Sequence, residues 1–151
     1  MTAADRTAMA RALELAADAA AASEIPVGAV VLDADGRIVA EGRNNREATH
    51  DPTGHAEVEA LRGAAASVGS WNLDGHTLVV TLEPCLMCAG AILQARIGRV
   101  VFGAWDDKAG AAGSMYDVLR DRRLPYRAEV VGGVEADAAT ALLRDFFEQR
   151  R

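Results

Sequence analysis

The sequence predicts an α/β fold in which a central mixed sheet of five strands lies between two layers of helices, a three-layer α/β/α arrangement. Short apolar runs alternate along the chain with longer amphipathic stretches, which is typical of strands that alternate with helices. The first two runs are joined by a tight turn and indicate an antiparallel hairpin, so the sheet is expected to be mixed. A chain of 151 residues, half of them hydrophobic, suits a single domain over residues 1–151 with one core.

In the first half of the chain, turn-forming and capping residues set the expected boundaries. Pro26 ends the first amphipathic stretch, and Asp33-Ala34-Asp35-Gly36 is a turn between two apolar runs. Thr53 is a candidate N-cap for the helix that follows an irregular loop. The elements expected here are a helix over 2–23, strands over 27–32 and 37–42, a loop over 44–54 and a helix over 55–68.

In the second half, strands and helices continue to alternate. The run Thr77–Leu82 is rich in Val and Thr and predicts a strand, and Pro84 suits the first position of the helix after it. The further elements expected are a helix over 85–95, a strand over 99–103, a loop-rich segment over 103–125 with a short helical piece near 116–119, a strand over 127–131 and a helix over 135–150.

Composition and charge exclude some classes of protein and leave others open. No apolar run approaches the roughly 18 residues of a membrane span, and the first six residues show no basic region followed by an apolar stretch, so we expect a cytoplasmic protein without a membrane segment. The formal charge of −6 argues mildly against a nucleic-acid partner. Arginines nevertheless cluster, either as phosphate contacts or as solvated surface, at positions 120, 122, 123 and 127 and at 144, 150 and 151.

Two short motifs carry the chemistry, namely His55-Ala56-Glu57 and Pro84-Cys85-Leu86-Met87-Cys88. One imidazole and two thiols are zinc ligands, and three protein ligands rather than four are typical of a catalytic zinc ion. Cys85 and Cys88 are the only cysteines, and their spacing in a reducing cytosol favours a metal over a disulfide. Both motifs fall at expected helix starts, where the partial positive charge favours thiolates. We therefore expect two helix N-termini to converge on one zinc ion.

Glu57 is the expected proton shuttle rather than a fourth ligand. Zn²⁺, two thiolates and a neutral imidazole sum to zero charge, so this centre acidifies water less than a centre of three histidines and needs a nearby base. We expect Glu57 to take a proton from zinc-bound water and to pass it to a substrate ring and to the leaving amine. The spacing H-x-E followed by P-C-x-x-C is the signature of zinc deaminases. The alternative for Glu57 is an acid that only interacts with the helix dipole.

The same residues allow other readings of the site. The two cysteines are alternatively a redox pair or two inert buried thiols, which leaves the His-x-Glu motif unexplained. His50 is a candidate fourth ligand that would close the site and make the chain a non-catalytic, zinc-stabilised binding module. His76, which opens a strand, is expected to be a surface or capping group.

Over these motifs and well beyond them, the chain resembles the bacterial tRNA-specific adenosine deaminases, which are cytidine deaminase-like proteins. The resemblance covers nearly the whole chain. Its zinc motifs fit the wider superfamily, whereas the Gly-Ala-Ala-Gly-Ser loop and the Asp-Phe-Phe ending narrow the match to the tRNA enzymes. The segments that carry it are 25–30, 51–57, 81–91, 96–104, 110–114 and 142–147.

The resemblance implies a cytidine deaminase-like fold and an activity. It implies hydrolytic deamination of adenosine to inosine at the wobble position (34) of a tRNA anticodon, typically that of an arginine tRNA, by a homodimer with one Zn²⁺ per subunit that binds the anticodon stem-loop. By match of position, His55, Cys85 and Cys88 hold the zinc ion and Glu57 shuttles protons. The rival function with the same zinc chemistry is deamination of a free nucleobase or nucleoside of the guanine or cytosine type.

The resemblance also implies substrate contacts, each with a structural alternative. Asn44 is expected to hydrogen-bond the flipped nucleoside, although it also suits a turn. The remaining contacts implied are Val27 and Ala56 in the pocket wall, Asp106 and Lys108 beside the anticodon loop, and Phe146 near the extruded nucleotides. Phe147 is expected in the core. Trp105 departs from the family, which is expected to have a polar or basic residue there, and it is a candidate to stack on a base.

Overall fold

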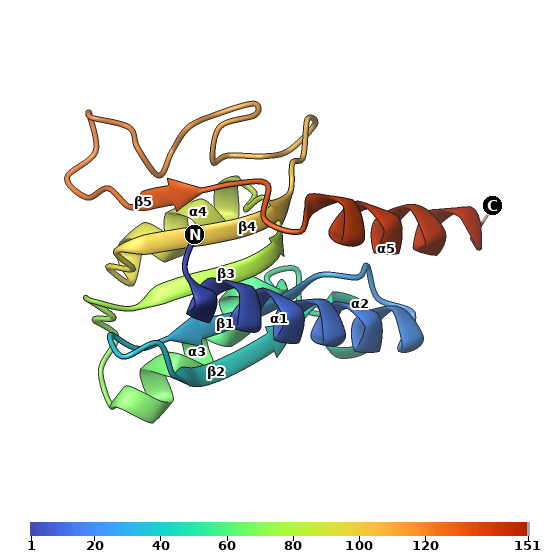
Figure 1. Cartoon of the computed structure of the whole chain (residues 1–151), viewed down its shortest axis with the longest axis horizontal. Helices are drawn as coiled ribbons and strands as arrows, with labels where there is room; N and C mark the ends of the chain where they lie inside the picture. Colours follow the sequence, from blue (N-terminus) through green and yellow to red (C-terminus); the bar gives the residue numbers. More distant parts are fainter. Residues whose placement is uncertain (151) are drawn as a thin grey trace.

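The computed structural model describes residues 1–150, and Figure 1 shows its arrangement. Among these residues, no helix is long and apolar enough to cross a lipid bilayer. The elements are α1 (Ala3–Ala21), β1 (Gly28–Leu32), β2 (Ile38–Arg43), α2 (Arg46–Thr49), α3 (Ala56–Val68), β3 (Thr77–Leu82), α4 (Leu86–Gln94), β4 (Arg99–Ala104), β5 (Glu129–Val131) and α5 (Ala136–Glu148).

The five strands form one mixed sheet in the order β2-β1-β3-β4-β5. β1 pairs antiparallel with both β2 and β3, whereas β3 with β4 and β4 with β5 pair in parallel. Helices α1 and α5 lie on one face of the sheet, and α3 and α4 cover the other (Figure 1). The predicted α/β fold with a mixed five-stranded sheet between two helical layers is therefore confirmed.

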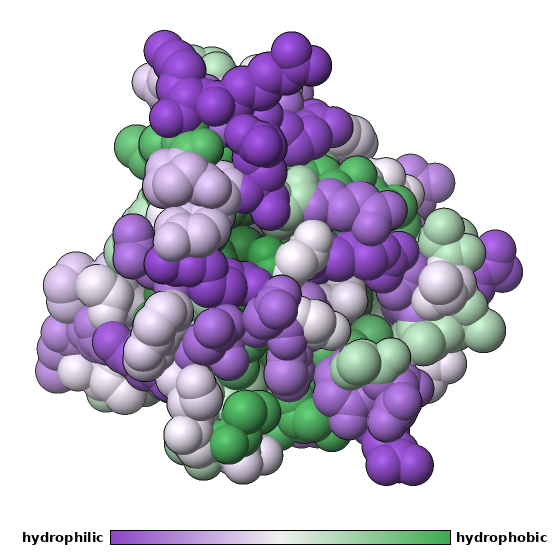
Figure 2. Space-filling model, turned by 90° about the vertical axis from the view of Figure 1, so that its left-hand side faces the viewer, coloured by the Kyte–Doolittle hydropathy of each residue, from purple (hydrophilic) through white to green (hydrophobic). Residues whose placement is uncertain are grey.

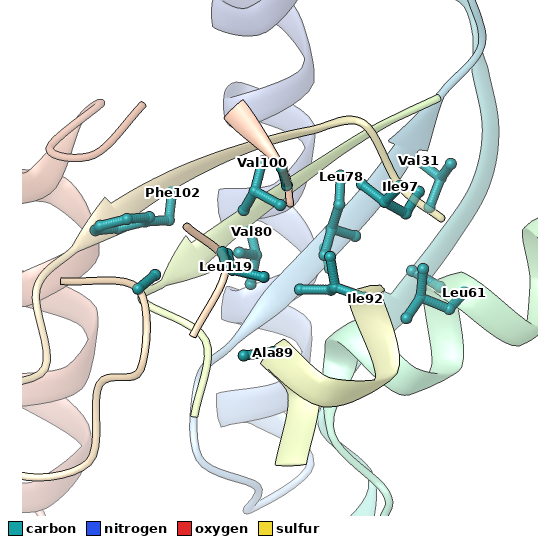
Figure 3. Close-up of a cluster of buried hydrophobic side chains, with 14 of the residues drawn as sticks. Val31, Leu61, Leu78, Val80, Ala89, Ile92, Ile97, Val100, Phe102 and Leu119 are labelled. Carbon is teal, nitrogen blue, oxygen red and sulfur yellow. The ribbon is translucent and has the colours of Figure 1, made fainter. Parts of the chain in front are cut away.

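Alternation along the strands divides the core between the two faces of the sheet, because successive side chains point to opposite sides. In β3, Leu78 and Val80 pack with α3 and α4, while Val79 packs with α1. The apolar runs of β1, β3 and β4 are thus strands buried on both faces, whereas the edge strands β2 and β5 are more exposed. Figure 3 shows the larger cluster, which includes Val31, Leu61, Ala89, Ile92, Val100, Phe102 and Leu119.

A glycine in β2 lets α3 lie directly against the sheet. A Cβ atom at Gly42 would collide with the backbone of the first turn of α3, at the carbonyl of Ala56 and the nitrogen of Ala60. This close approach fixes where α3 begins relative to the strands. It therefore also places the residues of the His-x-Glu motif at one end of the sheet.

Two predictions of helix starts are wrong. Thr53 does not cap α3: its hydroxyl and its backbone N–H both bond to the Asp51 carboxylate, and His55 occupies the N-cap position. Pro84 is not the first residue of a helix, because Cys85 after it is the N-cap of α4. In both helices the N-cap position is thus occupied by a residue of the chemical motifs rather than by a conventional capping side chain.

The short helix expected near residues 116–119 is absent, and this prediction is also wrong. The segment instead folds back on itself through a hydrogen bond from the N–H of Gly113 to the carbonyl of Tyr116 and a bridge between Ala112 and Asp117. In a helix, the backbone N–H and C=O groups of this segment would bond to one another along the helix axis. Here they are satisfied instead by hydrogen bonds between two neighbouring stretches of the chain.

The segment from residue 105 to 128 crosses the top of the molecule in Figure 1. In Figure 2, which is turned about the vertical axis, the top of the molecule is covered mainly by hydrophilic residues. Part of the arginine cluster lies here, and two of its members are already paired. Arg120 contacts Asp117 at 3.0 Å and Arg123 contacts Asp121 at 2.8 Å. These ion pairs reduce the positive charge that the cluster offers to a partner.

One buried carboxylate joins α1 to the sheet. Asp5 is 1% exposed and accepts hydrogen bonds from the backbone N–H of Thr2 at 2.8 Å and from both terminal nitrogens of Arg99 at 2.7 Å. The hydrogen bond with the guanidinium lowers the pKa of Asp5 to about 2, against the opposing effect of burial. The pair fixes the first turn of α1 on the first residue of β4.

Asp5→Asn should lower the free energy of unfolding by about 2 kcal/mol at pH 7, since each unit of pKa shift corresponds to roughly 1.4 kcal/mol. Because the folded-state pKa of Asp5 is depressed, its contribution is complete above the unfolded-state pKa of about 4 and is lost as the pH falls towards 2. Urea unfolding at pH 7 and at pH 2–4 measures the difference between variant and wild type. Asp35→Asn in the exposed turn is the control. An equal decrease in the free energy of unfolding in both variants would contradict the prediction.

Candidate active site

The two chemical motifs meet where α3 and α4 begin. His55 is the N-cap of α3 with φ −84° and ψ 151°, and Cys85 is the N-cap of α4 with φ −76° and ψ 176°. Neither side chain bonds to its own helix as a cap, so both are free to point forward from the helix end. Cys88 lies in the first turn of α4 and is buried. Two positively polarised helix N-termini thus surround one point.

The three side chains fit a zinc ion. Nδ1 of His55 lies 3.6 Å from Sγ of Cys85 and 3.4 Å from Sγ of Cys88, and all three ligand atoms lie within 4.8 Å of one another. Tetrahedral zinc, with bonds of about 2.3 Å to sulfur and 2.0–2.1 Å to nitrogen, separates such ligands by about 3.5 Å. Among residues 1–150 the group contains no fourth His, Cys, Asp or Glu. His50 is exposed and does not join it.

Hydrogen bonds join the three ligand side chains to one another. The hydrogen bond from Cys88 lowers the pKa of Cys85 to about 4, although burial opposes the shift. The same bond raises the pKa of Cys88, because its proton stabilises the neighbouring thiolate. The hydrogen bond with Cys85 also raises the pKa of His55. One thiolate between two proton donors is the arrangement in which a bound cation takes the place of protons.

Glu57 lies in the first turn of α3, is 4% exposed and lines the pocket beside the ligand group. In the metal-free chain burial raises the pKa of Glu57 to about 7, and the Cys85 thiolate adds to the shift. A neighbouring divalent cation has the opposite effect and favours the carboxylate. Glu57 is thus a buried carboxyl beside the ligand group whose pKa lies near neutrality, a property that suits a general acid or base.

The ligand group opens into a pocket of about 180 Å³. Val27, Ala56 and Asn44 line it, and Asp106 contributes from the segment after β4. Five further lining residues have no role predicted from the sequence. They are Ile25, Arg46, Leu82, Glu83 and Ala109.

Asn44 makes a turn contact, which is one of the two roles that the sequence left open, and its contact with a nucleoside stays a prediction. Its side-chain carbonyl accepts the backbone N–H of Arg46 at 3.1 Å, which is a turn contact, and its side chain is buried in the pocket wall. The contact fixes the amide plane and leaves the amide nitrogen to a ligand. The next helix, α2, is held by the buried Glu24, which accepts the N–H groups of Glu47 and Ala48 at 2.9 and 2.8 Å.

The remaining predicted contacts lie outside the pocket. Lys108 is exposed on the segment that carries Asp106, whose carboxylate accepts the N–H of Lys108 at 3.1 Å. Phe146 is buried on α5 under the guanidinium of Arg150, 3.5 Å from the ring centroid. The expectation that Phe147 lies in the core is wrong, because it is 51% exposed.

Trp105 lies half exposed at the end of β4, next to Asp106. Its ring packs edge-on against Phe102, with 4.7 Å between the ring centroids. A Cβ atom at Gly132 would collide with both rings, so the backbone there leaves room for the indole. Trp105 is therefore held in place on its inner side and open to solvent on its outer side.

Comparison with known proteins assigns the family. Residues 2–104 match the family described as the cytidine and deoxycytidylate deaminase zinc-binding region, a span that includes the three ligand residues and Glu57. The chain belongs to this deaminase family. The metal of the family is zinc, in agreement with the donor set and spacing of the ligand group.

Relatives within the family extend the match to almost the whole chain. A tRNA-specific adenosine deaminase of Haemophilus influenzae is 48% identical over 147 residues, which are 97% of this chain and 85% of the relative. A Deinococcus deserti protein named tRNA(Ile)-lysidine synthase is 52% identical over 96% of this chain. The chain spans only 27% of the length of that protein and 25% of the corresponding protein of Deinococcus radiodurans.

Solved structures resemble the whole deaminase fold. One from a study of A-to-I editing by tRNA:A34 deaminases at the wobble position has a TM-score of 0.87 and 37% identity, and the match covers 91% of this chain and 99% of that one. Guanine deaminase from Nitrosomonas europaea has a TM-score of 0.82 and 27% identity, with 93% and 83% covered. The two kinds of deaminase thus share this fold.

Removal of the zinc ion should stop turnover and leave most of the fold intact, because two buried apolar clusters hold the helices on the sheet without help from the ligands. We expect chelated protein to keep its far-ultraviolet circular dichroism and a cooperative urea transition, and to recover activity when Zn²⁺ is added. Cooperative unfolding on chelation would contradict this expectation and favour the zinc-stabilised binding module.

Proposed function

We propose that this chain deaminates adenosine to inosine at the wobble position (34) of a tRNA anticodon. The observation that carries the reaction type is a buried carboxylate, Glu57, in the wall of a pocket that opens on a group of three zinc ligands. The substrate class is supported by the Haemophilus influenzae relative, whose identity of 48% extends over 97% of the chain. Similarity to the tRNA:A34 deaminase structure, at a TM-score of 0.87, supports the position in the tRNA.

In this proposal His55, Cys85 and Cys88 hold the zinc ion. When bound, the ion supplies a Lewis acid that makes water more acidic. Glu57 would accept a proton from the attacking water and donate it to the ring nitrogen next to C6 as oxygen adds at that carbon. It would then accept the proton of the new C6 hydroxyl and donate it to the amino group, which leaves as ammonia when the bond from C6 to the amine breaks. Because the pocket wall buries Glu57, bulk water does not compete for these protons.

The other pocket residues would position the base. Val27 and Ala56 supply apolar walls, and the amide nitrogen of Asn44 donates to the extruded nucleoside. Asp106 and Lys108 lie on one segment at the pocket edge, where they would contact the anticodon loop. The role of Phe146 near the extruded nucleotides, and the choice of an arginine tRNA, stay predictions. A loop nucleotide suits this pocket, since it leaves its stack at little cost.

The test is inosine formation in an anticodon stem-loop of arginine tRNA with adenosine at position 34, measured by mass spectrometry of the digested RNA. We expect turnover by the zinc-loaded chain. Glu57→Gln should keep the zinc content and lower turnover by roughly 10²–10⁴-fold, since it retains the size of the side chain and removes the proton shuttle.

Two controls separate this proposal from its rival. A stem-loop with the adenosine moved away from position 34 should not react, and free guanine, cytosine, adenosine and cytidine should not be turned over. Turnover of a free base or nucleoside, with none of the stem-loop, would replace the proposal by a small-molecule deaminase, the function of the Nitrosomonas europaea protein. Full activity of Glu57→Gln would remove Glu57 from the mechanism.

We further propose that the chain acts as a homodimer in the cytoplasm, where its proposed substrate is found. Support for the dimer comes from an apolar groove of about 310 Å³ between α3 and α4, on the side of these helices that faces away from the sheet. Trp71 at its edge is 64% exposed. The residues that line the groove are Val58, Leu61, Arg62, Ala65, Trp71, Ala91, Gln94 and Ala95.

Ala65→Glu places a charge in this groove and should shift the protein from a dimer of about 32 kDa to the monomer of 15.9 kDa, because a buried unpaired carboxylate opposes association. Sedimentation equilibrium measures the shift. Ile38→Glu is the control, since Ile38 is 40% exposed on the edge strand β2. A monomeric wild type, or a dimer that withstands Ala65→Glu, would contradict this surface as the interface.

A further inference from the structure

A second buried carboxylate lies beside the active site and is used by neither the zinc ligands nor the proton shuttle. Glu83 follows β3, two residues before Cys85, and is 2% exposed. Among residues 1–150 no Arg, Lys or His side chain forms an ion pair with it. Burying a carboxylate is costly unless hydrogen bonds replace its hydration. Its position therefore calls for an explanation.

The hydrogen bonds of Glu83 all go to one segment of the chain. Its oxygens accept the backbone N–H groups of Asp106, Ala112 and Ser114 at 3.0, 3.1 and 3.0 Å, and also the hydroxyl of Ser114 at 2.5 Å. The carboxylate thus binds a stretch of irregular backbone that has no helix or sheet ladder of its own.

The bound segment is shaped to receive this carboxylate. A Cβ atom at Gly110 would collide with the Glu83 carboxylate, so a larger residue there would displace the carboxylate from this position. The N–H of Ala111 donates to the carbonyl of Pro84 at 2.8 Å, and Gly110 forms a bridge with Cys85. The segment from 106 to 114 is therefore held against residues 83–85, the stretch of chain that leads into the zinc ligands.

The same segment forms part of the pocket wall, because Asp106 and Ala109 line the pocket. We propose that Glu83 is a positioning residue, whose hydrogen bonds to residues 106–114 hold this wall at the distance from Cys85 that the substrate base requires. Since its oxygens are occupied by protein donors, Glu83 acts through Asp106 and its neighbours. The part of this inference that concerns the RNA substrate rests on the proposed function.

Glu83→Gln tests the inference, because an amide offers only one acceptor oxygen and turns an N–H donor towards N–H donors. We expect kcat/KM on the stem-loop to fall about 10–100-fold, a loss typical of residues that support metal ligands through hydrogen bonds without binding the metal themselves. The loss should lie mainly in KM, with zinc content unchanged. In amide exchange measured by NMR without substrate, the N–H groups of Asp106, Ala112 and Ser114 should lose protection.

Ser114→Ala tests the same hydrogen bonds at a donor residue, one that lies far in sequence from the zinc ligands. It removes the hydroxyl donor and should raise KM in the same direction but less, while Ser114→Thr should restore most of the loss. Asp5→Asn is the matched control, a buried carboxylate with a comparable set of donors at α1 and β4. It should lower stability and leave KM unchanged.

Three results would overturn the inference. They are a KM for Glu83→Gln that equals that of Asp5→Asn, unchanged protection of the three amides, and a loss of activity that follows a loss of zinc. Inactivity of the wild type on the stem-loop would instead overturn the proposed function. The exchange measurement would then still decide whether Glu83 holds the segment, because it needs no substrate.

Discussion

The active site depends on one constraint, which is that the N-termini of α3 and α4 meet at the same end of the sheet. His55 and Cys85 take the N-cap positions of these helices without capping them. Each helix thereby gives up a capping interaction that is commonly worth about 1 kcal/mol. In return the imidazole and the thiol point out of the helix ends, into the positive potential that favours thiolate ligands. The close contact of α3 with Gly42 and the parallel pairing of β3 with β4 keep the two helix ends in register.

Two buried carboxylates near this point have opposite environments. Glu57 lies in the apolar pocket wall, where burial raises its pKa to about 7 in the metal-free chain. Glu83 accepts four hydrogen bonds from the segment 106–114, which together lower its pKa. A carboxyl whose proton is easily gained and lost suits acid–base chemistry, whereas a permanently charged one suits the binding of backbone N–H groups. The two environments therefore suit Glu57 to the acid–base role proposed for it and Glu83 to the proposed binding of the segment 106–114.

Local patterns predicted what depends on local sequence. The bounds of β3, Thr77–Leu82, agree with the structure because an apolar run rich in Val and Thr ends at polar residues on both sides. The ligand group was predictable because its residue types have a narrow chemistry. The helix starts predicted from Thr53 and Pro84 were wrong because the zinc-ligand residues His55 and Cys85, rather than residues with a high capping propensity, occupy the N-cap positions of α3 and α4. The contacts of Glu83 join residues 23–31 positions apart, and no short-range signal announces a pairing between a side chain and the backbone of a distant loop.

The charge distribution bears on how such a site would hold an RNA loop. The chain carries a formal charge of −6, and Arg120 and Arg123 are paired with neighbouring aspartates. Arg46 is the one Arg or Lys among the described residues that line the pocket. These ion pairs and the negative net charge reduce the number of phosphates that the protein can neutralise, and the contribution of counterion release to binding falls with that number. On the proposed function, the fit of the extruded base in the pocket, whose wall includes the segment held by Glu83, then supplies a larger share of the free energy of binding. An acidic protein could act on RNA in this way, since contacts to an unstacked base do not depend on the charge of the nucleic-acid backbone.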